Sequence, residues 1–230
     1  DLDIGMNDWM CRDLRWDDAY RPDRGKVLSA EDLAGRDKFY RYLDRDDDAI
    51  PYRTLPGVHP KGAFFTRGSG HNQYGAYTED STEYQVVLDR LKRKFSAAAA
   101  YVPKPELIGK GDNKIGIVSI GSCDGAVREA VDVLARQKIP VDYLRIKAFP
   151  FGAEVESFLS MHATIFVVEQ NRDAQLRSLL TLETAVDKSK LKSILSYSGF
   201  PMSCEPVIAG IRATLPDAPR LSAISGKSVR

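Results

Sequence analysis

The clearest chemical signal in the sequence is a polar run that directly follows an apolar one. Residues 164–168 are apolar and β-branched, typical of a buried strand, and residues 169–173 read Glu-Gln-Asn-Arg-Asp. Open α/β sheets bind ligands at the carboxyl ends of their strands, which makes Glu169, Asn171 and Gln175 candidate site residues. The alternative is that these polar groups cap the next helix and seal a contact with another domain.

A second turn invites a nucleotide interpretation but does not support it. Residues 121–125 read Gly-Ser-Cys-Asp-Gly, so Cys123 stands where a G-x-G-x-x-G motif needs its second glycine. No acidic residue ends the following strand, where Arg145 and Lys147 are found. The helix that begins here could still hold an anion at its N-terminus, but a plain strand-to-helix turn is the favoured interpretation. Gly226-Lys227-Ser228 lacks the upstream glycine of a phosphate-binding loop and is discarded.

Histidine offers the remaining candidate for acid–base or charge chemistry. Of the three histidines, His162 precedes the buried strand and is interpreted as structural, and His59 has no special pattern. His71 lies in a polar, glycine-containing loop at 67–72, where it could contact a substrate or change charge near neutral pH. No Ser-His-Asp triad or pair of catalytic acids can be argued, so no catalytic residue is named.

Cysteine usage and charge exclude several classes of protein. Cys11, Cys123 and Cys204 are far apart, so we expect neither a zinc nor an iron–sulfur site, and their sparse number fits a reducing, cytoplasmic location. The 33 basic and 32 acidic residues nearly cancel, which argues against nucleic-acid and membrane-surface partners. No apolar stretch approaches the roughly 20 residues that span a bilayer.

The elements that must position these residues alternate between strands and helices in the second half of the chain. Strands are predicted at 115–120, 141–146 and 164–168, with 191–195 leading into a fourth, and amphipathic helices lie between them. This order predicts an α/β fold with a mostly parallel sheet that is covered by helices.

The first half is less regular. Ser29 has the character of an N-cap for a helix that carries Leu33, Phe39 and Leu43, and the acidic run 44–48 is interpreted as a solvated turn that ends it. A short strand is predicted at 63–66. A long helix is predicted to begin after Asp80 and to reach about residue 101, with a solvated basic face (Arg90, Lys92, Arg93 and Lys94).

Residues 51–78 are rich in proline and glycine yet carry Phe64, Phe65, Tyr74 and Tyr77. Long irregular segments in compact proteins are often functional, and four large rings are costly to leave in water. We predict that this segment contacts a neighbouring subunit or another domain. The alternative is that its rings fold back onto the long helix.

Several long stretches closely resemble the alpha subunit of 2-oxoacid:ferredoxin oxidoreductases, in particular the 2-oxoglutarate (KorA-type) branch. The opening residues 1–9 (DLDIGMNDW) also resemble that branch, and the resemblance extends to about Leu215. The stretches that carry it are 53–57 (RTLPG), 61–71 (KGAFFTRGSGH), 75–80 (GAYTED), 149–151 (FPF) and 167–177 (VVEQNRDAQLR).

The resemblance implies a domain order. Residues 1–110 would be the C-terminal end of a thiamine-diphosphate pyrimidine-side domain with its connector helix and linker, residues 111–216 a transketolase C-terminal-like domain, and residues 217–230 a tail. The sequence begins without an initiator Met, in the middle of the family pattern. We therefore expect it to be the C-terminal part of a longer alpha subunit that is inactive alone.

The resemblance also implies the chemistry of the whole enzyme, which is oxidative decarboxylation of a 2-oxoacid to acyl-CoA and CO2 with reduction of ferredoxin. The missing N-terminal part of the alpha subunit and the beta subunit would be partners, and the beta subunit would hold the magnesium–diphosphate site and the iron–sulfur cluster. This chain alone would bind no cofactor.

If the substrate is 2-oxoglutarate, its distal carboxylate needs a cation, and Arg53, Arg67 and His71 are the candidates. Two other functions stay open: an assembly module without substrate contact, and a free-standing nucleotide-binding domain, which the broken glycine pattern disfavours.

Overall fold

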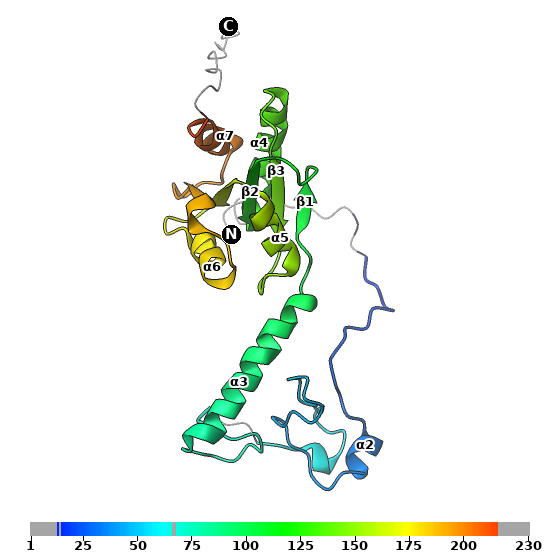
Figure 1. Cartoon of the computed structure of the whole chain (residues 1–230). Coiled ribbons are helices and arrows are strands. Elements are labelled where there is room, and N and C mark those ends of the chain that lie inside the picture. The colour runs from blue at the N-terminus through cyan, green and yellow to red at the C-terminus, as the bar shows by residue number, and fades with distance from the viewer. Residues whose placement is uncertain (1–12, 14, 66–67, 216–230) are drawn as a thin grey trace. The chain divides into compact units, whose positions relative to one another are not determined.

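The computed structural model describes residue 13, residues 15–65 and residues 68–215, and it divides into two compact units. One unit comprises the described residues up to Tyr101, and the other comprises the described residues from Val102 onward. Figure 1 follows the chain through both. No helix within the described residues is long and apolar enough to cross a bilayer.

The sheet unit contains five strands in the order β1-β3-β2-β4-β5. The strands β2, β3, β4 and β5 run parallel, whereas β1 pairs antiparallel with β3 at one edge. The predicted α/β fold with a mostly parallel sheet is therefore confirmed. The strand bounds are β1 Glu106–Ile108, β2 Ile115–Ile120, β3 Asp142–Ile146, β4 Thr164–Glu169 and β5 Leu191–Leu195.

Four helices cover the two faces of this sheet. On one face, α4 and α7 pack against strand residues such as Ile117 and Phe166. On the other face, α5 and α6 pack against alternate residues such as Val118 and Val167. The strands are apolar at successive positions because both of their faces are buried. The helix bounds are α4 Asp124–Arg136, α5 Ala153–Met161, α6 Gln175–Glu183 and α7 Cys204–Arg212, with short 3-10 turns η3 Gly121–Cys123 and η4 Lys188–Lys190.

The helix bounds in the other unit differ from the prediction. The helix that Ser29 caps, α2, covers only Ala30–Ala34. The following residues form turns and bends, and the rings of Phe39, Tyr40 and Tyr42 make tertiary contacts with Phe64, Tyr74 and His71 in place of a continued helix. The prediction of a helix through Leu43 is wrong.

Two further local predictions are corrected in this unit. Residues 63–65 form no strand, because the ring of Phe64 packs on Phe39 and the segment follows the 3-10 turn η1 Pro60–Gly62; Thr66 lies outside the described residues. The basic residues of the long helix are also not all solvated. Arg90 is only 8% exposed, and Arg93 makes ion pairs with Asp44 and Asp47.

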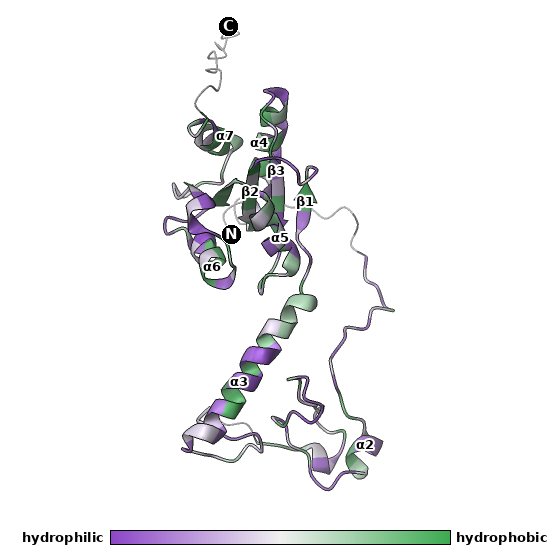
Figure 2. Ribbon diagram, in the orientation of Figure 1, coloured by the Kyte–Doolittle hydropathy of each residue, from purple (hydrophilic) through white to green (hydrophobic). Residues whose placement is uncertain are grey.

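The long helix itself is confirmed as α3, Ser81–Ala97, which continues into the turn η2, Ala98–Ala100. The side chain of Asp80 accepts hydrogen bonds from the backbone N–H groups of Thr82 and Glu83, as its N-cap position predicts. Apolar and polar residues alternate along α3 (Figure 2), and several large apolar side chains stay about half exposed (Tyr84, Leu88, Leu91 and Phe95).

Candidate functional site

Glu169 is the last residue of β4, and the structure gives it a capping role. Its side chain is 4% exposed and accepts hydrogen bonds from the backbone N–H groups of Leu176 at 2.6 Å and Arg177 at 3.1 Å. It also accepts one from Nδ2 of Asn171 at 2.8 Å. A carboxylate at this point satisfies the free N–H groups of the first turn of α6 and complements the helix dipole.

Asn171 completes this cap, and Gln175 contributes its backbone. Oδ1 of Asn171 accepts hydrogen bonds from the backbone N–H groups of Asp173 and Gln175. The side chain of Gln175 is exposed. Between them, Ala174 adopts a left-handed backbone with φ 51°, a conformation that costs a residue other than glycine about 1–3 kcal/mol. The observed bonds agree with the helix-capping alternative for this loop.

The loops after β2 and β4 meet at the carboxyl edge of the sheet. The strand order places the topological switch point between these two strands, because the chain leaves them toward opposite sides. Oγ of Ser122 donates a hydrogen bond to Oε1 of Gln170 at 2.6 Å across this point. Beside it, burial raises the pKa of the Cys123 thiol to about 11, so this cysteine is not a ready nucleophile.

The remaining three candidates belong to the other unit. Arg53 is exposed; its backbone pairs with residues 26–28, and its Nη1 donates to the carbonyl oxygen of Arg24 at 3.5 Å. The ring of His71 stacks on Tyr42 with centroids 4.0 Å apart, and its Nδ1 donates to the carbonyl oxygen of Asn72 at 2.9 Å. Arg67 lies outside the described residues.

The structure links Arg53 and His71 through a residue pair that the sequence interpretation missed. Arg41 donates a hydrogen bond from Nη1 to the carbonyl oxygen of Tyr52 at 3.4 Å, immediately before Arg53. Its neighbour Tyr42 stacks on His71. The only available signal was a charged residue among the aromatics of 39–42, which was interpreted as helix.

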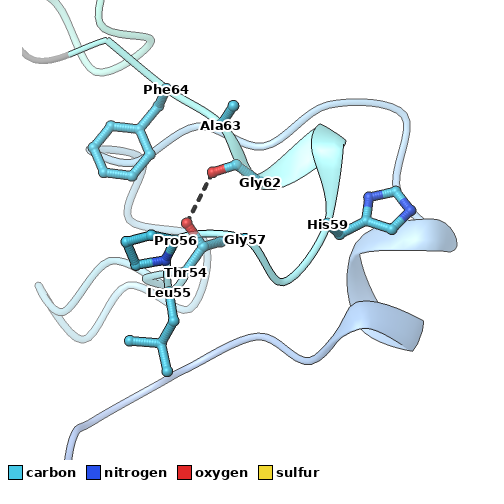
Figure 3. A pocket seen from close by; sticks show the side chains of 8 residues that line it. All are labelled: Thr54, Leu55, Pro56, Gly57, His59, Gly62, Ala63 and Phe64. Carbon is cyan, nitrogen blue, oxygen red and sulfur yellow. Dashed lines mark hydrogen bonds between the residues drawn. The ribbon is translucent and has the colours of Figure 1, made fainter.

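A cavity of about 580 Å³ is lined by residues that follow Arg53 in the sequence. Such a volume lies within the roughly 300–1,000 Å³ typical of small-molecule sites. Figure 3 shows the rings of Pro56 and Phe64 on one side of a hydrogen bond between the Thr54 hydroxyl and the Gly62 carbonyl, and His59 on the other. The lining is mainly apolar and backbone, and consists of Thr54, Leu55, Pro56, Gly57, His59, Gly62, Ala63 and Phe64.

One buried polar cluster is structural and lies near the amino end of the sheet. Nε2 of His162 contacts Oδ2 of Asp142 at 3.2 Å, and Nδ1 of His162 donates to the carbonyl oxygen of Phe158. Burial would raise the pKa of Asp142, but hydrogen bonds from Gly111, Asn113 and His162 outweigh it and hold that pKa below its usual value. His162 therefore has the structural role that was predicted from its position before the buried strand.

The donor groups of the described residues do not fit a metal site. No group of three or more His, Cys, Asp or Glu side chains comes together within them. Cys123 and Cys204 are both buried, each in its own element, and burial raises the pKa of each thiol. These cysteines do not form the clustered thiolates that hold iron–sulfur centres.

The fold matches that of a large oxidoreductase. The chain superimposes on a structure of 2-oxoglutarate:ferredoxin oxidoreductase from Magnetococcus marinus with 2-oxoglutarate, coenzyme A and succinyl-CoA bound, with a TM-score of 0.69 over 78% of this chain. The two sequences are 23% identical, and the match covers 31% of the solved chain. The α/β architecture is therefore the one found in that class of enzyme.

Proteins with similar sequences are named as alpha subunits of 2-oxoacid:ferredoxin oxidoreductases. The chain is 26% identical over 181 residues to 2-oxoacid:ferredoxin oxidoreductase 2, subunit alpha, of Aeropyrum pernix. It is 27% identical over 164 residues to the 2-oxoacid:ferredoxin oxidoreductase subunit alpha of Saccharolobus solfataricus. These matches cover 76% and 69% of this chain but only 27% and 26% of the relatives. The chain thus spans about a quarter of the length of these proteins, and no family model matches it.

Proposed function

We propose that this chain is the C-terminal part of the alpha subunit of a 2-oxoacid:ferredoxin oxidoreductase, with 2-oxoglutarate as substrate. The observation that carries the proposal is the sequence similarity to alpha subunits over about three quarters of the chain. The fold, which is similar to that of a solved 2-oxoglutarate:ferredoxin oxidoreductase, supports it. The whole enzyme would oxidatively decarboxylate its substrate to acyl-CoA and CO2 and reduce ferredoxin. Its setting would be the cytoplasm.

In this proposal the cofactors are held elsewhere. Within the described residues, no group of three or more His, Cys, Asp or Glu side chains could hold a metal ion. As the family resemblance implies, thiamine diphosphate and Mg would be bound with the help of the beta subunit and the N-terminal part of the alpha subunit, and the iron–sulfur cluster by the beta subunit.

The contribution of this chain would be a scaffold, a subunit interface and one wall of the substrate pocket. Arg53 and His71 would contribute that wall, with Arg67 as the third candidate. A guanidinium group can hold a carboxylate through two parallel hydrogen bonds, which suits the distal carboxylate of a dicarboxylic 2-oxoacid. The domain order would be that of residues 1–110, 111–216 and 217–230.

A second function, that of an assembly module, is favoured by one specific observation. Four aromatic side chains in residues 51–78 remain between 43% and 76% exposed, namely Phe64, Phe65, Tyr74 and Tyr77. Exposed apolar groups that cluster on one segment are typical of interfaces. This function needs no contact between the chain and the substrate.

The test is an activity assay with and without the other parts. The chain alone should be colourless and should not reduce a viologen dye with 2-oxoglutarate and coenzyme A. The complete alpha subunit that contains it, together with the beta subunit, should reduce the dye. A complex that reduces the dye with pyruvate but not with 2-oxoglutarate would refute the assigned substrate, and one that is inactive with both would refute the reaction.

A further inference from the structure

Arg41 is held in place by the contacts on either side of it. Residues 39–42 form no helix, and Arg41 and Tyr42 lie in a turn. The rings of this segment contact partners in residues 64–74: Phe39 with Phe64, Tyr40 with Tyr74 and Tyr42 with His71. These pairs have centroid distances of 5.8, 5.1 and 4.0 Å. Because its neighbours are anchored, the backbone of Arg41 is positioned without any bond from its own side chain.

The guanidinium group of Arg41 lies next to the backbone that leads into Arg53. Its Nη1 is 3.4 Å from the carbonyl oxygen of Tyr52, which belongs to the peptide bond that joins Tyr52 to Arg53. Arg41 is partly buried, whereas Arg53 is exposed. Within the described residues, neither arginine has a carboxylate within salt-bridge distance, and the bonds of both side chains go to backbone carbonyl groups.

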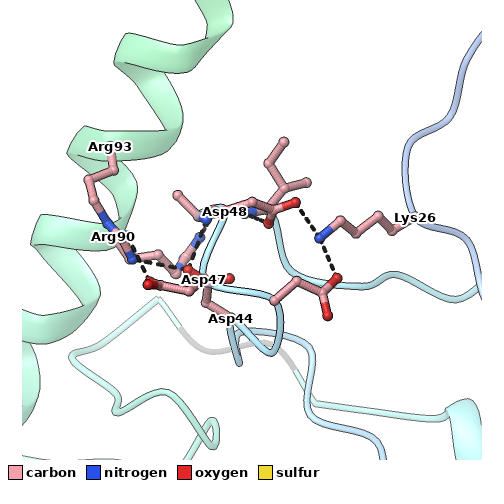
Figure 4. Close-up of polar contacts among 9 residues, drawn as sticks. Lys26, Asp44, Asp47, Asp48, Arg90 and Arg93 are labelled. Carbon is pink, nitrogen blue, oxygen red and sulfur yellow. Dashed lines mark hydrogen bonds and ion pairs between the residues drawn. The ribbon is translucent and has the colours of Figure 1, made fainter.

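The acids of the neighbouring loop are already paired with other cations. Lys26 bridges Asp46 and Asp48, and Arg93 makes ion pairs with Asp44 and Asp47. Figure 4 shows Lys26 and Arg93 approaching this loop from opposite sides. Each of these carboxylates therefore has a cation of its own, although Oδ1 of Asp44 is buried without a hydrogen bond, and none of them makes an ion pair with Arg41.

Within the part of the chain that the structure describes, no ion pair compensates the charge of Arg41. Burial lowers the pKa of the Arg41 guanidinium, and the nearby charge of Arg53 lowers it further. Arg90, on α3, is close enough for its own pKa to be lowered by burial and, in smaller part, by Arg41, although Asp44 opposes this. Guanidinium groups that are partly desolvated and face like charge are unfavourable unless an anion joins them.

We propose that Arg41 and Arg53 together bind an oxyanion, either a carboxylate or a phosphate group, and that Arg41 is the partner that orients Arg53. The forked N–H groups of arginine match both anions. The identity of the ligand rests on the function proposed above, which offers two sources: a carboxylate of a 2-oxoacid and a phosphate of coenzyme A. The same site could be filled by either, so the experiment must separate them.

The experiment measures binding to the full chain by isothermal titration calorimetry with three probes: 2-oxoglutarate, coenzyme A and inorganic phosphate. The monocarboxylate 2-oxobutyrate and dephospho-coenzyme A serve as matched ligands that each lack one anionic group. The variants are Arg41→Gln, Arg53→Gln and Arg41→Lys, with Arg45→Gln as the control because Arg45 is an exposed arginine of the same unit. Thermal unfolding of each variant checks that it is folded.

We expect Arg41→Gln and Arg53→Gln each to weaken binding of the correct probe on the order of tenfold to a hundredfold, as loss of a charged hydrogen bond would. Arg41→Lys should recover part of the loss, and Arg45→Gln should bind as the parent does. Stronger binding of 2-oxoglutarate than of 2-oxobutyrate identifies the substrate carboxylate as the source. Stronger binding of coenzyme A than of its dephospho form identifies the phosphate.

Two results would overturn the proposal. One is a parent chain that binds none of the three probes at millimolar concentration, and the other is an Arg41→Gln variant that binds like Arg45→Gln. Binding of inorganic phosphate alone, with the expected dependence on both arginines, would uphold the oxyanion site while removing support for the proposed substrate. The failure of this inference is therefore separable from the failure of the proposed function.

Discussion

At the scale of single residues, the buried polar groups of this molecule have a clear role, which is to stabilise the fold through hydrogen bonds. Glu169 and Asp142 are both buried acids, and each accepts several backbone N–H groups in place of water. Such bonds offset the cost of removing a carboxylate from water. Among the described residues, Arg41 and Arg53 make no ion pair and donate to backbone carbonyl groups, which is why the proposed ligand site lies there.

Asp142 gives a testable dependence of stability on pH. Its pKa is lowered in the folded state, so the carboxylate stabilises the fold above its unfolded pKa of about 4. That stabilisation should be lost as the pH falls through the lower folded-state pKa. Urea unfolding at a series of pH values should show the free energy of unfolding falling below about pH 4.

The comparison variant is Asp142→Asn, which should be less stable near neutral pH and should lose less stability on acidification. Asp132, an exposed acid on α4, provides the control. If Asp142→Asn and Asp132→Asn followed the parent curve with the same slope in acid, the pairing of Asp142 would not be the cause of the acid sensitivity.

At the scale of elements, the sequence predicted the sheet well and the irregular segments poorly. The predicted strands at 115–120, 141–146 and 164–168 lie within a residue of the observed ones, because a strand buried on both faces has to be apolar throughout. The three-residue strand β1 and the helix α7 were missed. β1 is too short to show a pattern, and it forms through its pairing with β3.

The site could be predicted in part, for a related reason. The capping loop was visible because it follows a strand directly, whereas Arg41 was not, because its role depends on ring pairs that join residues 39–42 to residues 64–74. Contacts between segments so far apart leave no periodicity in either of them. The weak helical pattern around Phe39 therefore led to the prediction of a helix. Tertiary packing gives this segment another conformation.

The cap of α6 gives the prediction at this scale. Asn171→Ala removes the acceptor for the N–H groups of Asp173 and Gln175 and the donor to Glu169, so it should lower the free energy of unfolding by about 1–3 kcal/mol. Gln175→Ala, which changes an exposed side chain on the same turn, should shift it by less than about 0.5 kcal/mol. Chemical denaturation of both variants measures this. An Asn171→Ala variant that is as stable as the parent, but inactive in the assembled enzyme, would make the loop catalytic instead.

At the scale of the whole molecule, the two units differ in how fully their apolar groups are covered. The sheet unit buries its strands on both faces, with separate apolar clusters under α4 and α7 and under α5 and α6. In the other unit the described apolar core is small, formed by Leu28, Leu33 and Phe39 with Tyr52 and Val58 packed against it. A small core of this kind favours stabilisation by a partner.

Residues 51–78 are where we expect that partner to bind. The rings of Phe64 and Tyr74 contact Phe39 and Tyr40 within the unit, yet they remain partly exposed, and Phe65 is 76% exposed. The internal contacts therefore cover one side of these rings and leave the other side available. A surface of this kind typically becomes an interface when a partner is present.

Hydrogen–deuterium exchange distinguishes an interface from internal packing. Amides of residues 53–65 and 68–77 should exchange quickly in this chain alone, because few of them bond within a helix or strand, and they should become protected in the complex with the beta subunit and the rest of the alpha subunit. Amides of β2 and β4 should be slow in both states and provide the internal reference. Equal protection of 53–65 and 68–77 in the two states would show that the segment is internal packing, and the proposal of a shared pocket at Arg53 and His71 would then fail with it.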